Sequence, residues 1–204
     1  MGSRQIAIID GGGANIASLE FALARLGAES VLTRDAGRIR DASHVILPGV
    51  GAAADAMGRL RSANLDAVIP ALTQPVLGIC LGMQLLAGGS EENSTDCLGV
   101  VDGVSAELDA SPESPVPNMG WCPIRRDPGH RDHPILAGIE EGSYFYFVHS
   151  FALPVADYTV ASADHARPFT AVLARRNFVA TQFHPERSAR AGARILRNFL
   201  ELDA

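Results

Sequence analysis

A cysteine between two glycines, at the end of an apolar run, is the feature that most constrains the fold of this chain. The segment reads Gly78-Ile79-Cys80-Leu81-Gly82, and the turn signal Gln74-Pro75 precedes it. Residues 76–79 are predicted as a short buried strand and residues 81–86 as the first turns of a helix. The pattern therefore predicts that Cys80 occupies a sharp strand-to-helix corner.

A corner of this kind is suited to presenting a nucleophile. In the G-x-S-x-G elbow, flanking glycines allow a strained turn that exposes a serine, and the next backbone N–H faces the developing oxyanion. Here the same spacing carries a thiol. The unpaired N–H groups at a helix N-terminus favour the thiolate, which is the attacking form.

A base and an orienting group follow a second strand-like run, at residues 178–183. Side chains two apart on a strand face the same way, so His184 and Glu186 are expected on one side of the strand end, where Pro185 stops further pairing. Taken singly, a cysteine is more often core filler and His-Pro-Glu more often a turn. Together, Cys80, His184 and Glu186 predict a thiol, imidazole and carboxylate catalytic set.

The first half of the chain alternates between strand and helix patterns. Strands are expected at residues 4–10, 29–33, 44–47 and 76–79, and helices around 15–26, 52–61 and 65–72. After Leu98, strand and turn patterns dominate, with a loop at 111–117, a strand at 144–153 and a final helix. We expect an α/β fold: an open, mostly parallel central sheet flanked by helices, with an additional antiparallel β portion in the second half.

Length and composition narrow the class of protein. A chain of 204 residues is expected to form a single domain, 1–204, and its net charge of −6 opposes nucleic-acid binding. Cys80, Cys97 and Cys122 lack zinc-site spacing, and the unpaired thiols predict a cytoplasmic location without a metal. No stretch approaches the roughly 18 apolar residues of a membrane span.

Three further patterns are relevant, and the first and the last of them leave alternatives open. Pro48-Gly49-Val50-Gly51 is either a plain loop or a source of a second oxyanion donor, since glycines free backbone N–H groups to face a ligand. Gly11-Gly12-Gly13 does not match the G-x-G-x-x-G spacing of dinucleotide-binding loops. Four arginines, Arg187, Arg190, Arg194 and Arg197, are predicted on one face of the final helix, as a solvated face or with Arg187 near a partner.

With these motifs identified, the chain resembles the class I, triad-type glutamine amidotransferases. Residues 78–84 match the nucleophile segment of that family and residues 182–186 match its base segment. Residues 48–51, 117–121 and 146–151 are similar to those of its glutaminase subunits in imidazole glycerol phosphate synthase, of histidine biosynthesis. The resemblance runs from about Ile6 to Leu200.

The resemblance implies that Cys80 attacks the side-chain amide of L-glutamine, with His184 as acid and base and Glu186 orienting the imidazole. It implies an oxyanion hole from Leu81 and from Val50 or Gly51, and no cofactor. The implied glutamine-binding residues are Gly49, Gln84, Glu92, Ser150 and Phe151. Glu92 is equally readable as part of a solvated acidic turn.

The resemblance also implies that ammonia passes to a (β/α)₈-barrel cyclase partner in a heterodimer, which makes imidazole glycerol phosphate and aminoimidazole carboxamide ribotide. The implied interface residues are Asn15, Ser18, Met119, Trp121, Tyr146, His149 and Arg187. Trp121 and His149 also fit a half-buried tryptophan and a core histidine. Ala14, Cys122 and Arg187 stand where the family usually has glycine, asparagine and lysine, which affects partner contact rather than chemistry.

Two other functions remain to be weighed. One is the glutaminase subunit of another amidotransferase, of the anthranilate or pyridoxal phosphate synthase type, which the segments at 117–121 and 146–151 oppose. The other is a non-catalytic regulatory member of the fold. The complete set of Cys80, His184 and Glu186 opposes it, because a binding module does not need all three.

Overall fold

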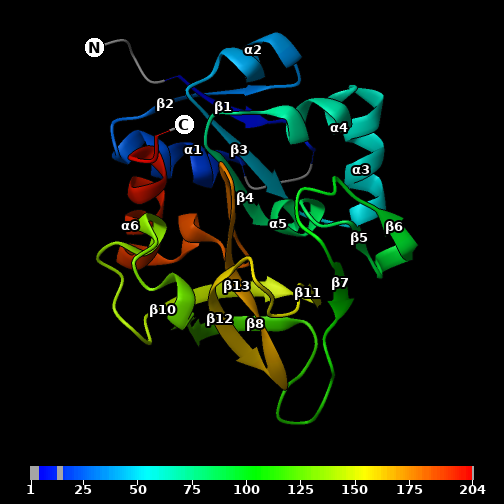
Figure 1. Cartoon of the computed structure of the whole chain (residues 1–204), viewed down its shortest axis with the longest axis vertical. Helices are drawn as coiled ribbons and strands as arrows, with labels where there is room; N and C mark the ends of the chain where they lie inside the picture. The colour runs from blue at the N-terminus through cyan, green and yellow to red at the C-terminus, as the bar shows by residue number, and fades with distance from the viewer. Residues whose placement is uncertain (1–4, 13–15, 204) are drawn as a thin grey trace.

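The computed structural model describes residues 5–12 and 16–203. Its centre is an eight-stranded sheet with the order β2-β1-β3-β4-β14-β13-β12-β9 (Figure 1). The strands are β1 Gln5–Ile9, β2 Glu29–Thr33, β3 His44–Gly49, β4 Val76–Cys80, β9 Arg125–Arg126, β12 Thr159–His165, β13 Arg167–Arg175 and β14 Phe178–Thr181. The first five in the sheet order run parallel and the last three antiparallel, as the sequence patterns predict.

Helices cover both faces of the parallel part (Figure 1). They are α1 Ile16–Arg25, α2 Ala36–Asp41, α3 Ala53–Ser62, α4 Leu65–Val68, α5 Leu81–Leu85 and α6 Ala189–Leu200. Side chains alternate across β1: Ile6 and Ile8 pack with α1 and α6, whereas Ala7 and Ile9 pack with α2, α3 and α4. This double burial explains why β1 and β3 read as continuous apolar runs.

Two smaller sheets, in which all strand pairs but one are antiparallel, accompany the central sheet. β8 Asn118–Pro123 pairs with β10 Tyr144–His149, and the second sheet has the order β11-β7-β5-β6. Its strands are β5 Gly89–Ser90, β6 Thr95–Asp96, β7 Val104–Glu107 and β11 Phe151–Ala152. Short 3₁₀ turns complete the fold: η1 Ile69–Ala71, η2 Glu92–Ser94, η3 Pro128–His130, η4 Pro134–Leu136 and η5 Pro185–Arg187.

Three details differ from the sequence expectations. Helix α2 was not predicted, although Asp35 caps it by accepting the Arg38 N–H at 2.7 Å. The strand expected at 144–153 breaks at Ser150 into β10 and β11, which belong to different sheets. Arg187 was wrongly placed on the final helix: it lies in η5, before α6 begins at Ala189. No helix among the described residues is long and apolar enough to cross a membrane.

Candidate active site

Cys80 is the last residue of β4 and directly precedes α5, with φ 53° and ψ −110°. A non-glycine residue in this region costs about 1–3 kcal/mol, so the surrounding packing must hold it there. That packing is close: a Cβ at Gly82 would overlap the Leu47 carbonyl oxygen, and one at Gly49 would lie 2.8 Å from the Gly82 nitrogen. The glycines thus let α5 approach the end of β3 and hold the corner in shape.

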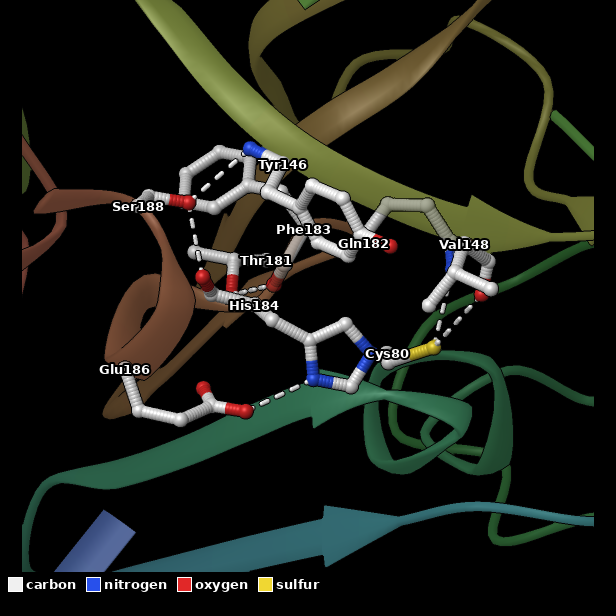
Figure 2. Close-up of polar contacts among 9 residues, drawn as sticks. All are labelled: Cys80, Tyr146, Val148, Thr181, Gln182, Phe183, His184, Glu186 and Ser188. Carbon is white, nitrogen blue, oxygen red and sulfur yellow. Dashed lines mark hydrogen bonds and ion pairs between the residues drawn. The ribbon is translucent and has the colours of Figure 1, made fainter. Parts of the chain in front are cut away.

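His184 and Glu186 form a buried pair on the opposite side of the site. His184 Nδ1 lies 2.8 Å from Glu186 Oε1, and both side chains are less than one-tenth exposed. The order of groups is visible in Figure 2, where the imidazole lies between the carboxylate and the Cys80 thiol. His184 Nε2 makes no hydrogen bond within the described residues, which leaves this nitrogen available for proton transfer.

The charge state of His184 follows from these neighbours. Burial alone would lower its pKa, but interactions with Cys80 and Glu186 outweigh burial and raise the pKa to about 10. The imidazole is therefore protonated at neutral pH. A protonated imidazole beside a thiol can stabilise a thiolate and can later give a proton to a leaving group.

The pair is built by a turn rather than by a strand end, which corrects the sequence argument. β14 ends at Thr181, and Glu186 lies in η5. Ser188 secures this turn, because its Oγ donates to the His184 carbonyl at 2.7 Å and accepts the Tyr146 N–H at 3.0 Å. The His184 N–H in turn donates to the Tyr146 carbonyl at 3.0 Å. His184 is thereby anchored to β10.

A cavity of about 310 Å³ opens in front of the thiol. It is lined by Val50, Gly51, Cys80, Leu81, Gln84, Glu92, Val148, His149, Ser150, Phe151 and His184. The structure thus brings together most residues that the sequence assigns to catalysis and glutamine binding. Gly49 does not line this cavity and instead packs against Leu81 and Gly82 at the start of α5. A larger cavity, of about 540 Å³, lies over α6 at Arg190, Arg194 and Arg197, away from the nucleophile.

The wall of the cavity near the corner carries candidate oxyanion donors. Leu81 begins α5, and Gly51 has φ +87°, a conformation that favours glycine. Glu92 reaches this wall from η2: its Oε2 accepts the Ala53 N–H at 2.7 Å, at the start of α3. Because Ala52 provides no side-chain cap, Glu92 caps α3 and ties η2 to the segment that holds Val50 and Gly51.

One residue beside Cys80 was matched in the sequence only as part of the segment 182–186 and was given no role. Gln182 is fully buried, and its Nε2 donates to Cys80 Sγ at 3.7 Å. Its Oε1 accepts from Gln84 Nε2 at 3.1 Å, while Gln84 also donates to the Phe151 carbonyl at 2.7 Å. The available signal was a pair of polar residues, Thr181 and Gln182, inside an apolar run, since a fully buried polar side chain needs partners.

The residues expected at a partner interface differ in how exposed they are. Met119 and Trp121 are 64% and 51% exposed on β8, and the Arg187 guanidinium lies 4.4 Å from the centre of the Tyr146 ring. Ser18 is half-buried on α1. His149, in contrast, is buried and lines the cavity, and Asn15 lies outside the described residues.

His149 is held as a neutral imidazole. Its Nδ1 donates to the Phe151 carbonyl at 2.9 Å, and its Nε2 accepts from Asn118 Nδ2 at 3.1 Å. Burial lowers its pKa to about 4, against the raising effect of the Phe151 carbonyl. The side chain is therefore a buried, hydrogen-bonded part of the cavity wall, an arrangement that agrees with the core-histidine alternative left open by the sequence.

Comparison with known proteins assigns the family. The family model for class I glutamine amidotransferases matches residues 7–202. The imidazole glycerol phosphate synthase subunit HisH of Vibrio parahaemolyticus is 44% identical over 208 residues, covering 99% of this chain and 100% of the relative. The protein of the same name from Xylella fastidiosa is 48% identical over 203 residues, covering 98% of each.

Solved structures share the fold at much lower identity. The structure of PurLQS from Thermotoga maritima superposes with a TM-score of 0.71 at 18% identity, covering 98% of this chain and 98% of the matched chain. That likeness supports the α/β architecture alone, whereas the family match and the relatives above 40% identity decide membership. The chain belongs to the class I glutamine amidotransferases, in the group whose members are named as the HisH subunit of imidazole glycerol phosphate synthase.

Proposed function

We propose that this chain is the glutaminase subunit of an imidazole glycerol phosphate synthase and that Cys80, His184 and Glu186 are its catalytic residues. The observation that carries the proposal is the placement of the thiol. Cys80 stands on a strained corner at the wall of a cavity, with the buried His184 and Glu186 pair beside it. A binding module has no need for such an arrangement.

In the first half-reaction, the Cys80 thiolate would be converted into a thioester. Cys80 Sγ attacks the side-chain amide carbon of L-glutamine, and the N–H groups of Leu81 and of Val50 or Gly51 hold the oxyanion. His184 then gives its proton to the departing nitrogen, so that the C–N bond breaks and ammonia departs. A γ-glutamyl thioester remains on Cys80. The raised pKa of His184 supports this role, because it keeps the imidazole protonated until the leaving group needs the proton.

Hydrolysis would complete the cycle. The neutral His184 takes a proton from water, the hydroxide attacks the thioester carbon, and the C–S bond breaks to release glutamate. Glu186 keeps the imidazole oriented through both steps. We place the substrate against Gln84, Glu92 and the backbone at Ser150 and Phe151, because these line the cavity beside the thiol.

For the ammonia, we propose transfer to a (β/α)₈-barrel cyclase in a cytoplasmic heterodimer, with this chain forming a single glutaminase domain. The exposed side chains of Met119 and Trp121 and the stacked Tyr146 and Arg187 supply an apolar and aromatic contact surface. A smaller cavity, of about 110 Å³, extends from His184 and Glu186 to Arg187. The names of the relatives support this partner over the anthranilate or pyridoxal phosphate synthase type.

The division of labour gives a direct experiment on the complex. Cys80→Ala is expected to abolish cyclase activity with glutamine but to retain activity with added ammonia, because the cyclase is unaltered. Cys97→Ala is the matched control, since this thiol lies outside the cavity, and should retain both activities. Loss of ammonia-dependent activity in an assembled Cys80→Ala complex would contradict the proposal.

Partner dependence gives a second experiment. The isolated chain should hydrolyse glutamine slowly and accelerate strongly when the cyclase with its nucleotide is added. The motivation is the glycine-containing segment at Val50 and Gly51, whose peptides must face the oxyanion for turnover. Fast glutamate release by the isolated chain, unchanged by the cyclase, would argue against this coupling.

A further inference from the structure

Gln182 occupies a fully enclosed position directly behind the nucleophile (Figure 2). Its backbone N–H is bonded to the Ala171 carbonyl of β13 at 2.9 Å, so the residue is anchored in the central sheet. Its side-chain amide bridges two groups of the site, Cys80 Sγ at 3.7 Å and Gln84 Nε2 at 3.1 Å. No assigned role in the proposed reaction accounts for this buried amide.

The hydrogen-bond network determines which way the amide points. Gln84 Nε2 has two protons: one goes to the Phe151 carbonyl and the other faces Gln182. Only an oxygen can accept that second proton, so Gln182 presents Oε1 to Gln84 and Nε2 to the sulfur. An N–H of Gln182 is therefore aimed at Cys80 Sγ.

The other polar contact of the Cys80 sulfur, with a backbone carbonyl, explains why a thiolate there needs a donor such as Gln182. Cys80 Sγ lies 3.7 Å from the Val148 carbonyl oxygen, which accepts the S–H of the neutral thiol. On ionisation the S–H is lost, and the carbonyl dipole then repels the negative sulfur. A donor on the other side offsets that repulsion, because hydrogen bonds to charged groups are stronger than those between neutral groups.

We propose that Gln182 holds Cys80 Sγ in its attacking position and stabilises the thiolate through an N–H···S hydrogen bond. This role rests on the proposed glutaminase function, in which the thiolate attacks. The titratable groups facing the sulfur are His184 with Glu186 on the turn after β14, neutral His149 on β10 and Glu92 across the cavity. Gln182 adds an uncharged donor from the residue that directly follows β14.

Gln182→Met tests the donor, because methionine fills a similar volume and cannot donate. We would measure the rate of Cys80 alkylation by iodoacetamide against pH on the full chain, with peptide mass spectrometry separating Cys80 from Cys97 and Cys122. The midpoint of the alkylation profile should move up by about one pH unit, the size expected of a charge-assisted hydrogen bond. In the complex, kcat for glutamine should fall about tenfold, and KM should rise as well, because methionine also removes the acceptor of the Gln84 proton.

Thr181→Val is the matched control. Thr181 is the equally buried neighbour, and its Oγ donates to the Phe183 carbonyl at 3.0 Å rather than to the sulfur. This variant should keep the wild-type alkylation midpoint. An unchanged midpoint in folded Gln182→Met, or an equal shift in Thr181→Val, would overturn the proposal.

If Gln182→Met does not fold, Gln182→Leu replaces it as a second variant that cannot donate. Loss of the N–H···S hydrogen bond should again raise the midpoint, and an unchanged midpoint would refute the role. Because alkylation does not require glutamine turnover, this test is separate from that of the glutaminase function. The assay of glutamine turnover in Cys80→Ala tests the glutaminase function. The alkylation midpoint tests the hydrogen bond from Gln182 to the Cys80 sulfur.

Discussion

Gly192 of α6 packs so closely on the turn carrying Glu186 that a Cβ at this position would overlap the Pro185 carbonyl oxygen. The same Cβ would lie 2.8 Å from Ser188 Cβ, and the Gly192 N–H donates to the Ser188 carbonyl at 2.9 Å. The final helix therefore supports the turn that carries His184 and Glu186 through backbone contact. Small displacements of α6 should be transmitted to His184.

Gly192→Ala should accordingly destabilise the protein and lower kcat. Overpacking of this kind costs about 1–3 kcal/mol, and the relief of the overlap moves η5. Gly58→Ala is the matched control, because Gly58 is a helical glycine of α3 with open space at its Cβ, and it should stabilise by about 1 kcal/mol. Urea unfolding and glutaminase assays of both variants check this, and equal stability changes would contradict it.

Glu186→Gln should change the pH dependence of stability. The pKa of His184 is raised from 6.5 to about 10 in the folded protein, so its contribution is fully present below pH 6.5 and is lost as the pH rises through 10. Removing the carboxylate charge lowers that pKa toward 6.5. Wild type should therefore lose more stability than Glu186→Gln between pH 6.5 and 10 in urea unfolding. Parallel curves would show that the pair does not hold the proton.

His149 should have the opposite effect. Its pKa is lowered from 6.5 to about 4, so its contribution to stability is present above pH 6.5 and is lost as the pH falls toward 4. Protonation would place an N–H of His149 against the Asn118 N–H that it now accepts. One pKa unit corresponds to about 1.4 kcal/mol, so this group should account for about 2 kcal/mol of the loss between pH 7 and 5.

His149→Gln is the variant for this measurement, because glutamine retains an acceptor and a donor but does not titrate here. Urea unfolding at pH 7 and pH 5 should give a smaller loss in the variant than in wild type. The difference between the two losses isolates His149 from other groups that titrate in this range. A loss equal to that of wild type would exclude the neutral imidazole.

Glu92→Ala should affect both α3 and glutamine binding. The variant leaves the Ala53 N–H without its acceptor, which should cost about 1 kcal/mol, and it loosens the segment at Val50 and Gly51. KM for glutamine should rise in the cyclase complex. Glu91→Ala is the control, because this exposed carboxylate accepts the Glu107 N–H at 2.9 Å and does not line the cavity. A KM increase of equal size in both variants would argue against a specific role for Glu92.

The corner at Cys80 was predictable from sequence because its causes are local. A strand pattern, a helix pattern and the glycines that allow close packing lie within seven residues, 76–82, and Cys80 itself adopts the positive φ of the corner. The alternation of strands and helices likewise predicted the parallel sheet, since each apolar run is buried on both faces. The pairing of His184 and Glu186 was also predictable, although its cause is the turn η5 and not strand alternation.

The sequence by itself determined the chemistry, because residue types and short spacings define a thiol, an imidazole and a carboxylate. Only the tertiary structure decided the surroundings of these groups. Gln182 approaches Cys80 across 102 positions of sequence, and Glu92 reaches Ala53 across 39. Contacts at such separations depend on which strands are neighbours in the sheet and how closely the helices pack. No local pattern records them, and they set the charge and position of the groups that the local patterns name.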